Sequence, residues 1–509
     1  MSVFIRMLLP ALLVLIFAAD TVKAQRWSRA DTKHFVVYSN GPAKNLEKAA
    51  TDLERLDALM RRLLRIPREE NPHRIDVYIV GSQIQVSALA GNRRVAGFYS
   101  PNIDGSYIVA HRERSTSSRM PGQVVLFHEY THHLMFRYFP TAYPAWYREG
   151  IAEYLSTTEF DDDSFTVGAP ASHRSNSVLN GNFLPLEEIL EPSERGNTRQ
   201  ARYMFYAQSW ALTHYLISDP ERNRKMVRYL AMLAKGGDPI ESAQETFGDL
   251  KALEKAVERY GRGKMIYRRS PEPIAIDGTV SVRKLDPLES DIVEARLHNR
   301  REYKLDRTRD NLIKLTAKHP ASADAYVELA VTERKLAHDN ETLDFGPAMA
   351  AIDKALELDP NHENGLILKA QLMLEADDHP EISDGEIDWE AIRGHAIKAN
   401  QINPDNPLAL FTYIDTFARE GGPMPEVAIP AMEQVFGTIP EVISVRVRLA
   451  RLHANSGNFD RALSLVGFLI GDPHNSERGR QLVAQIEAMR DRYNASNAGS
   501  PEEQAQEAL

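Results

Sequence analysis

Two histidines separated by three residues are the first feature of this chain that could do chemistry. The segment His128–His132 reads H-E-Y-T-H. Pro121 before it and Pro140 after it favour a helix between them, because proline is accepted in a first helical turn and cannot continue a helix. Four residues advance a helix by a little over one turn, so both imidazoles leave the same face and reach one metal ion, with Glu129 beside them. The spacing suits Zn²⁺.

The chain contains no cysteine, so a transition metal must be held by histidine and carboxylate side chains. A catalytic zinc has three protein ligands and keeps a fourth position for water, so a third ligand is needed downstream. A second helix is expected from Pro144 to about Leu155, and within it residues Trp146–Tyr154 read W-Y-R-E-G-I-A-E-Y.

This pair of segments resembles the gluzincin metallopeptidases, in particular the peptidase MA-like group of bacterial exported proteins. The resemblance implies a zincin-like α+β fold and makes Glu149, which precedes Gly150, the third zinc ligand beside His128 and His132. A metzincin would instead carry a third histidine shortly after the motif. Glu153 lies one helical turn after Glu149 and could accept the second ring N–H of a ligating histidine.

The resemblance also implies hydrolysis of peptide bonds. Zinc would lower the pKa of a bound water toward about 7, and Glu129 would take its proton as general base. Gluzincins use a tyrosine or histidine to stabilise the oxyanion, which points to Tyr206 first, then to Tyr203 and His214. Aromatic residues at helical spacing are also typical of a hydrophobic core. A packing role is therefore the alternative for each of these three residues.

The elements around the motif predict an α+β half. Strands are expected at residues 34–39, 74–80 and 107–110, the last as an edge that could pair with an extended substrate, as in related enzymes. Helices are expected at 42–66 before the motif, and at 199–217, 222–234 and 250–260 after it. Strands early and helices late give the α+β class.

Five segments of the second half share one frame of small or apolar residues that ends on a proline. Offsets of four and three place these residues on one helix face, and the proline stops each helix, so each segment is expected to be the second helix of a two-helix unit. The frames are Thr308, Leu312, Leu315, Pro320; Ala348, Ile352, Ala355, Pro360; Ile392, Ala396, Ala399, Pro404; Ala428, Met432, Val435, Pro440; and, one residue tighter, Ala462, Val466, Leu469, Pro473.

The frame resembles the tetratricopeptide repeat (TPR), most closely in Ala348–Pro360, which reads A-M-A-A-I-D-K-A-L-E-L-D-P. We therefore expect a metallopeptidase domain at residues 25–270, a proline-rich linker at 271–285, an all-α repeat solenoid at 286–490 and a disordered tail at 491–509. A non-repetitive helical bundle is the alternative for the second half.

The first 24 residues carry Arg6, an apolar run from Met7 to Ala19 and the small-residue site Val22-Lys23-Ala24, which is the pattern of a cleaved secretory signal. The apolar run is shorter than the roughly 20 residues of a spanning helix. We expect an exported protein of the bacterial periplasm or extracellular space, without a stable membrane span after cleavage.

Composition narrows the function classes. The apolar share of 43% and charged share of 26% are those of a globular protein. The net charge of −10 gives the surface no general attraction for a phosphate backbone, so nucleic acid is not an expected partner.

The sequence is consistent with two main functions. The first is a zinc metallopeptidase that hydrolyses peptide or protein substrates, with the repeats recruiting substrate or a protein partner. The alternative is a TPR scaffold or adaptor in which the zinc site is structural or vestigial. Hydrolysis of other amides or esters is a third possibility, because a zinc hydroxide beside a carboxylate can attack these as well.

Overall fold

The computed structural model describes residues 26–67, 69, 73–114, 120–139, 143–191, 198–340, 343–377, 387–471 and 476–497. The expected signal at residues 1–24 lies outside them. The elements of the first half are β1 Ser28–Asp31, β2 Phe35–Ser39, α1 Ala43–Leu64, β3 Ile75–Val80, α2 Gln83–Leu89, β4 Phe98–Ser100, β5 Tyr107–His111, α3 Gly122–Tyr138, α4 Ala145–Ser156, β6 Glu159–Phe160, β7 Phe165–Val167, α5 Ser172–Asn180, α6 Leu186–Leu190, α7 Arg199–Ile217, α8 Pro220–Leu233, α9 Pro239–Phe247, α10 Leu250–Gly261, β8 Arg268–Ser270 and β9 Ser281–Lys284.

The second half is helical. Its elements are α11 Pro287–Arg301, α12 Leu305–Lys318, α13 Ala323–Asp339, α14 Gly346–Leu358, α15 Glu363–Asp377, α16 Trp389–Ile402, α17 Pro407–Glu420, α18 Ala428–Thr438, α19 Ile443–Asn455, α20 Phe459–Val466, the 3₁₀ helix η2 Gly467–Gly471 and α21 Ser476–Asn497.

A six-stranded sheet organises the first half, in the order β4-β5-β3-β2-β1-β9. Strands β2, β3 and β5 run parallel, and β4, β1 and β9 are antiparallel to their neighbours. The central strands are almost continuously apolar and buried, as expected of strands covered on both faces. Alternate side chains therefore enter two different cores.

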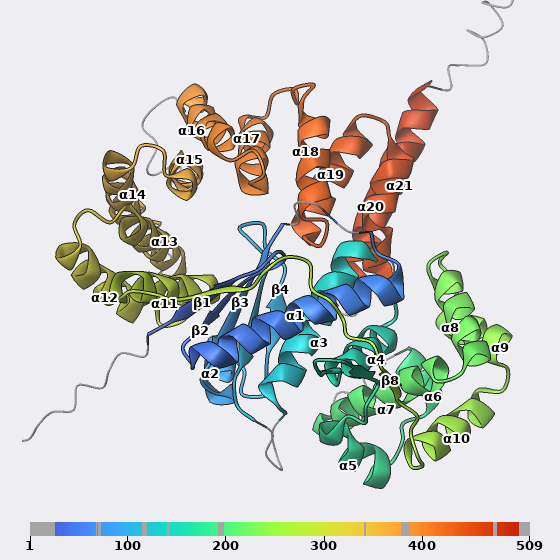
Figure 1. Ribbon diagram of the computed structural model, residues 1–509. Coiled ribbons are helices and arrows are strands. Elements are labelled where there is room, and N and C mark those ends of the chain that lie inside the picture. The colour runs from blue at the N-terminus through green and yellow to red at the C-terminus, as the bar shows by residue number, and fades with distance from the viewer. Residues whose placement is uncertain are drawn as a thin grey trace, which may run out of the picture.

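Helices from both halves of the chain cover this sheet (Figure 1). Val37, Val77 and Ile108 face the core formed with α1 and α3. The opposite face carries Tyr38, Tyr78 and Val109, together with side chains of α2 and α11. Helix α11 therefore belongs to the core of the first half although it lies within the region expected to be repeats.

Residues 271–285 do not form a simple linker. Within them β9 adds to the sheet beside β1, where Ser28 is paired with Lys284 and Asp31 with Ser281. Leu285 is buried against the sheet. The proline content of the segment suggested an unpaired connection, but pairing with a strand so distant in the sequence leaves no local signal.

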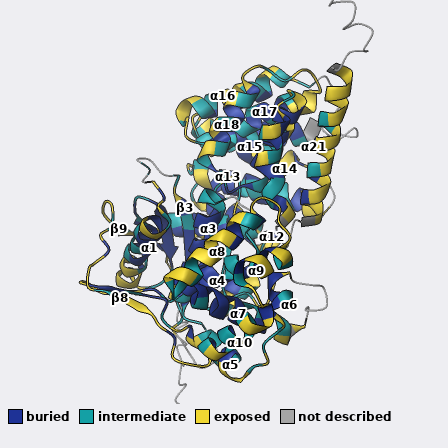
Figure 2. Ribbon diagram, turned by 90° about the vertical axis from the view of Figure 1, so that its right-hand side faces the viewer, coloured by how far each residue is buried: buried dark blue, intermediate teal, exposed yellow. Residues whose placement is uncertain are grey.

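Four of the five repeat frames are confirmed by helices of the second half; in the fifth, α20 ends at Val466, η2 contains Leu469, and Pro473 lies outside the described residues. Helices α12, α14, α16 and α18 end two residues before Pro320, Pro360, Pro404 and Pro440 respectively. Consecutive helices pack on one another from α11 to α21 and form a TPR-like array that curves over the first half (Figures 1 and 2). Residues 491–497, expected to be disordered, continue α21.

The described residues include no helix with the length and apolar character needed to cross a bilayer.

Candidate metal centre

Helix α3 carries the H-E-x-x-H segment and packs against one face of the sheet, next to β5 and β4. It begins after Pro121 and reaches Tyr138, as its two flanking prolines predicted. A side chain on Gly122 would place its Cβ 1.7 Å from the carbonyl oxygen of His111. Only glycine therefore allows the start of α3 to lie this close to the end of β5.

Helix α4 carries Glu149 and packs across α7 at a glycine. A Cβ on Gly150 would lie 2.0 Å from Thr213 Oγ1 and 2.5 Å from the Ser209 carbonyl oxygen. The missing side chain therefore lets the two helix backbones approach closely, which fixes the position of the neighbouring Glu149. The aromatic core beside this contact contains Trp146 and Trp210.

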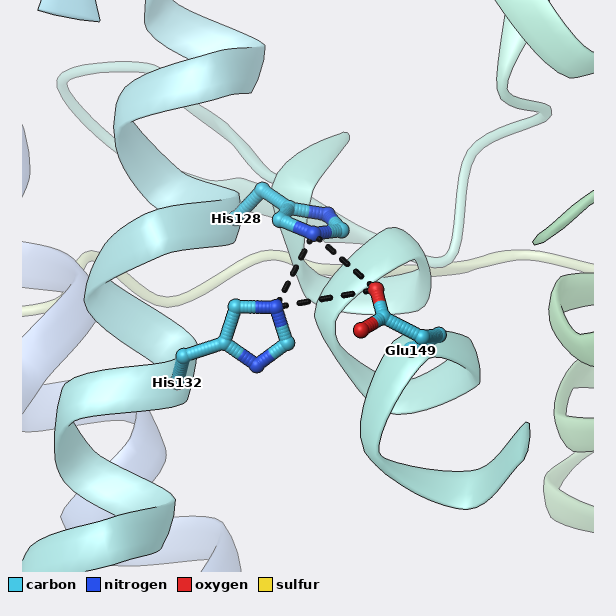
Figure 3. A group of neighbouring side chains, drawn as sticks. All are labelled: His128, His132 and Glu149. Atoms are coloured by element: carbon cyan, nitrogen blue, oxygen red, sulfur yellow. Dashed lines mark hydrogen bonds and ion pairs between the residues drawn. The ribbon is translucent and has the colours of Figure 1, made fainter. Parts of the chain in front are cut away.

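The three expected ligands converge on one point (Figure 3). His128 Nε2 and His132 Nε2 are 3.1 Å apart. Glu149 Oε2 lies 3.4 Å from the first nitrogen and 3.6 Å from the second. Two ligand atoms about 2.05 Å from a single zinc ion are roughly 3.3 Å apart at the tetrahedral angle. The three separations therefore suit a tetrahedral ion.

A buried acceptor without a partner supports the same fit. Glu149 Oε2 receives no hydrogen bond although it is buried. Such an atom costs free energy unless a donor or a cation satisfies it. Two imidazole nitrogens and one carboxylate form a donor set typical of catalytic zinc. The residues present therefore fit Zn²⁺.

The charges of these side chains depend on one another. Burial acts to raise the pKa of the Glu149 carboxyl, but the rings of His132 and His128 outweigh it and hold that pKa well below its ordinary value. Burial acts to lower the pKa of His128, but the Glu149 and Glu153 carboxylates raise it to about 9. The site is thus built around a carboxylate that stays ionised.

Glu129 is held between α3 and the edge of the sheet. The backbone N–H of Tyr99, in β4, donates to Glu129 Oε2 over 2.9 Å. A Cβ on Gly97 would lie 2.1 Å from a Val125 methyl, so this close approach of β4 to α3 requires glycine. Burial raises the pKa of the Glu129 carboxyl, against the opposing effect of the His128 and His132 rings.

The edge strand beside the centre is β4, and the expectation for residues 107–110 was wrong. Strand β5 is paired on both sides, with β3 and with β4, and has no free edge. Strand β4 has only β5 as a neighbour in the described sheet. Its three residues, Phe98–Ser100, are too short to give a recognisable alternation in the sequence.

Glu153 lies beside the second ring nitrogen of His128, as expected, but its close partners are other side chains. Its Oε1 lies 3.7 Å from His128 Nδ1, which is too long for a hydrogen bond. The carboxylate is fully buried and is instead paired with His173 at 2.7 Å and with Arg174 at 2.5 Å, both on α5. Sequence reasoning missed these two residues, because nothing local links α5 to α4.

The structure separates the three candidates for the oxyanion donor. Tyr206 is the candidate whose phenol responds to the centre, because the Glu149 carboxylate, followed by burial, raises its pKa. Tyr203 is 47% exposed. Both ring nitrogens of His214 are engaged, one with Tyr260 and one with a backbone carbonyl. His214 therefore belongs to the core.

A second group of side chains of the types that bind metals lies between α1 and α3. His34, Glu54 and Asp57 line a cavity of about 420 Å³ beside α1. The Glu54 carboxylate accepts hydrogen bonds from the backbone N–H and from Nδ1 of His34. The Asp57 carboxylate accepts hydrogen bonds from Arg61 and from the hydroxyl of Tyr130, which lies on α3. Because a guanidinium already covers Asp57, the group is an ion-pair cluster that fixes α3 against α1.

Comparison with known proteins finds partial structural alignments to TPR proteins. No protein-family model and no curated protein matches the chain. A thermophilic TPR protein of Thermus thermophilus aligns over 40% of this chain and 99% of its own, at 15% identity and a TM-score of 0.32. Pseudomonas aeruginosa pilF aligns over 43% and 96%, at 16% identity and a TM-score of 0.31. YrrB, a TPR protein with an unusual peptide-binding site, aligns over 38% of this chain and 91% of its own, at 16% identity and a TM-score of 0.27. Scores this low do not establish a fold, so the TPR-like assignment rests on the helix packing.

Proposed function

We propose that the chain is an exported zinc metallopeptidase whose repeats bind its substrate or a protein partner. The observation that carries the proposal is the convergence of His128 Nε2, His132 Nε2 and Glu149 Oε2 within a space that suits one ion. Glu129 follows His128 directly on the same helix, and the rings of His128 and His132 act on its carboxyl, which places a candidate general base beside the site. Gluzincin-like chemistry is the reaction class that this arrangement supports best.

In this mechanism the chain supplies the positioning and the proton transfers. A bound zinc ion supplies Lewis acidity, which lowers the pKa of water toward about 7. Glu129 takes the proton from the attacking water and returns it to the leaving amine. An extended peptide pairs with the open edge of β4, and the phenol of Tyr206 donates to the developing oxyanion.

A comparison of two variants tests the proposal. We expect the wild-type chain to bind about one zinc and to cleave peptides until a chelator is added. Glu129→Gln should retain the metal and lose at least about 100-fold in kcat, because it removes the base and no ligand. His128→Ala should lose the metal. Metal analysis and proteome-wide cleavage profiling against Glu129→Gln measure both, and a fully active Glu129→Gln protein would contradict the mechanism.

The scaffold alternative is favoured by the helix array itself. Stacked helix pairs such as α13 to α20 form the curved surfaces with which repeat proteins bind peptides and folded partners. If this is the whole function, the chain binds zinc and captures a partner, but cleaves nothing in a broad peptide library. Cleavage of small amide or ester substrates alone would identify a hydrolase outside the peptidases.

A further inference from the structure

One buried carboxylate of the repeats contacts the two elements that flank the candidate centre. Glu441 lies in the turn between α18 and α19 and is only 3% exposed. Ser106 Oγ, from the β4–β5 turn, donates to Glu441 Oε1 over 3.0 Å. Arg137 Nη1, near the end of α3, donates to Glu441 Oε2 over 3.1 Å and to the Thr438 carbonyl over 2.7 Å. The Glu441 carboxylate therefore joins the two halves of the chain through hydrogen bonds and an ion pair.

Apolar contacts accompany the ion pair. Ile103, in the β4–β5 turn, packs against the hydrophobic core of the last repeats. Ile439 and Val442, on either side of Glu441, are buried in that core. The turn is therefore docked, and Glu441 is not an isolated surface contact. We call residues 438–442 the docking turn.

Tyr99 connects the docking turn to the catalytic base. Its backbone N–H donates to Glu129, and its hydroxyl is 3.1 Å from His133 Nδ1. Its ring is stacked on Phe136, with centroids 6.3 Å apart. His133 Nδ1 is itself 4.0 Å from Glu441 Oε1. Tyr99 thus lies between α3 and the docking turn.

Glu441 bridges the two elements that hold Glu129. One is α3, which carries Glu129 and, two helical turns later, Arg137. The other is the β4–β5 hairpin, which carries Tyr99 and Ser106. Strand β4 has three residues and, within the described sheet, pairs only with β5. This short pairing alone would hold β4 weakly in its place beside α3. A buried carboxylate bonded to both elements restricts their relative movement.

We propose that Glu441 is a positioning residue that holds Tyr99 against Glu129, so that the repeats set the orientation of the catalytic base. The proposal rests on the metallopeptidase function for its effect on turnover, but the positioning itself does not depend on it. A partner that moves the docking turn would change the Tyr99–Glu129 hydrogen bond. The repeats are then part of the active centre as well as a binding surface.

The test compares Glu441→Gln with Glu433→Gln in the full-length, zinc-loaded chain. Glu433 is a matched control, because it lies on α18 and pairs with His453 and Arg461 inside the repeats. We expect amide hydrogen exchange at residues 98–100 to become roughly tenfold faster in Glu441→Gln, as local opening becomes easier. We expect kcat for a cleaved peptide to fall about tenfold with unchanged KM and zinc content. Glu433→Gln should leave exchange and kcat unchanged.

Each outcome decides the inference. Unchanged exchange at residues 98–100 in folded Glu441→Gln overturns it, whatever the activity. Faster exchange in a chain that cleaves no peptide supports the positioning while the proposed function fails. If Glu441→Gln does not fold, Glu441→Asp replaces it, because this variant keeps the charge, shortens the side chain that bonds Ser106 and Arg137, and should speed exchange by a smaller factor. No change in that variant also counts against the inference.

Discussion

The absence of a side chain at Gly150 decides where Glu149 lies. Gly150→Ala should force α4 away from α7, because its Cβ would collide with a backbone carbonyl of Ser209. We expect a loss of about 1–3 kcal/mol in stability and roughly 10- to 100-fold in zinc affinity. Urea unfolding and chelator competition measure the two effects. Gly394→Ala is the control, since nothing lies within 4 Å of that Cβ position on α16, and it should stabilise by about 0.5–1 kcal/mol.

Loss of the Glu153 carboxylate should strongly destabilise the first half. Glu153→Ala leaves the Arg174 side chain, which is 12% exposed, without its carboxylate. Breaking a buried ion pair from one side costs about 3–5 kcal/mol, and we expect a loss of this size in the free energy of unfolding. Glu159→Ala, at an exposed position on β6, should change it by less than about 0.5 kcal/mol. Equal effects of the two substitutions would show that the buried pair contributes nothing.

Among the elements, the Arg334–Glu375 pair joins α13 to α15 and should make repeat stability depend on pH. Burial acts to raise the pKa of the Glu375 carboxyl, but Arg334 outweighs it and holds that pKa below its ordinary value. The unfolded chain therefore binds this proton more tightly, so the stabilisation is complete above the unfolded pKa of about 4.3 and is lost as the pH falls below it.

Thermal unfolding of Glu375→Gln measures this contribution. At pH 7 the variant should be less stable by about 1–3 kcal/mol, the range for charge-assisted hydrogen bonds. The difference from the wild type should persist at pH 5.5 and shrink at pH values below about 4. A difference that grows on acidification would have the wrong sign and would exclude Glu375 as its source.

The convergence of the three candidate ligands could be anticipated from the sequence because most of its signal is local. His128 and His132 share one helix face by spacing alone, and the prolines at 121 and 144 predicted where both helices begin. The pairing of Tyr99 with Glu129 could not be predicted, since it joins a three-residue strand to a helix across a turn. The repeat helices were likewise indicated by their prolines, whereas the contact of Glu441 with α3 depends on how the whole array curves.

At the scale of the whole molecule, the two halves share one core. A chain truncated after residue 270 loses β9 and α11, and so exposes the sheet face that carries Tyr38 and Tyr78. We expect this fragment to be insoluble or to lack a near-UV circular dichroism signal, because it presents a large apolar patch. A chain truncated after residue 303 keeps both elements and should give more soluble protein. Equal yields and spectra would show that the sheet does not need α11.

The pairing of β1 with β9 also determines when the sheet can be completed during synthesis of the chain. Ser28 finds its partner Lys284 only after more than half of the chain has been made. Until then the sheet ends in an unpaired strand, which is a template for wrong partners. Contacts between such distant residues also slow folding, because a long loop must close before they form. The first half of this protein therefore cannot finish folding until β9 and α11 have been made, whereas the repeats that follow them can fold later.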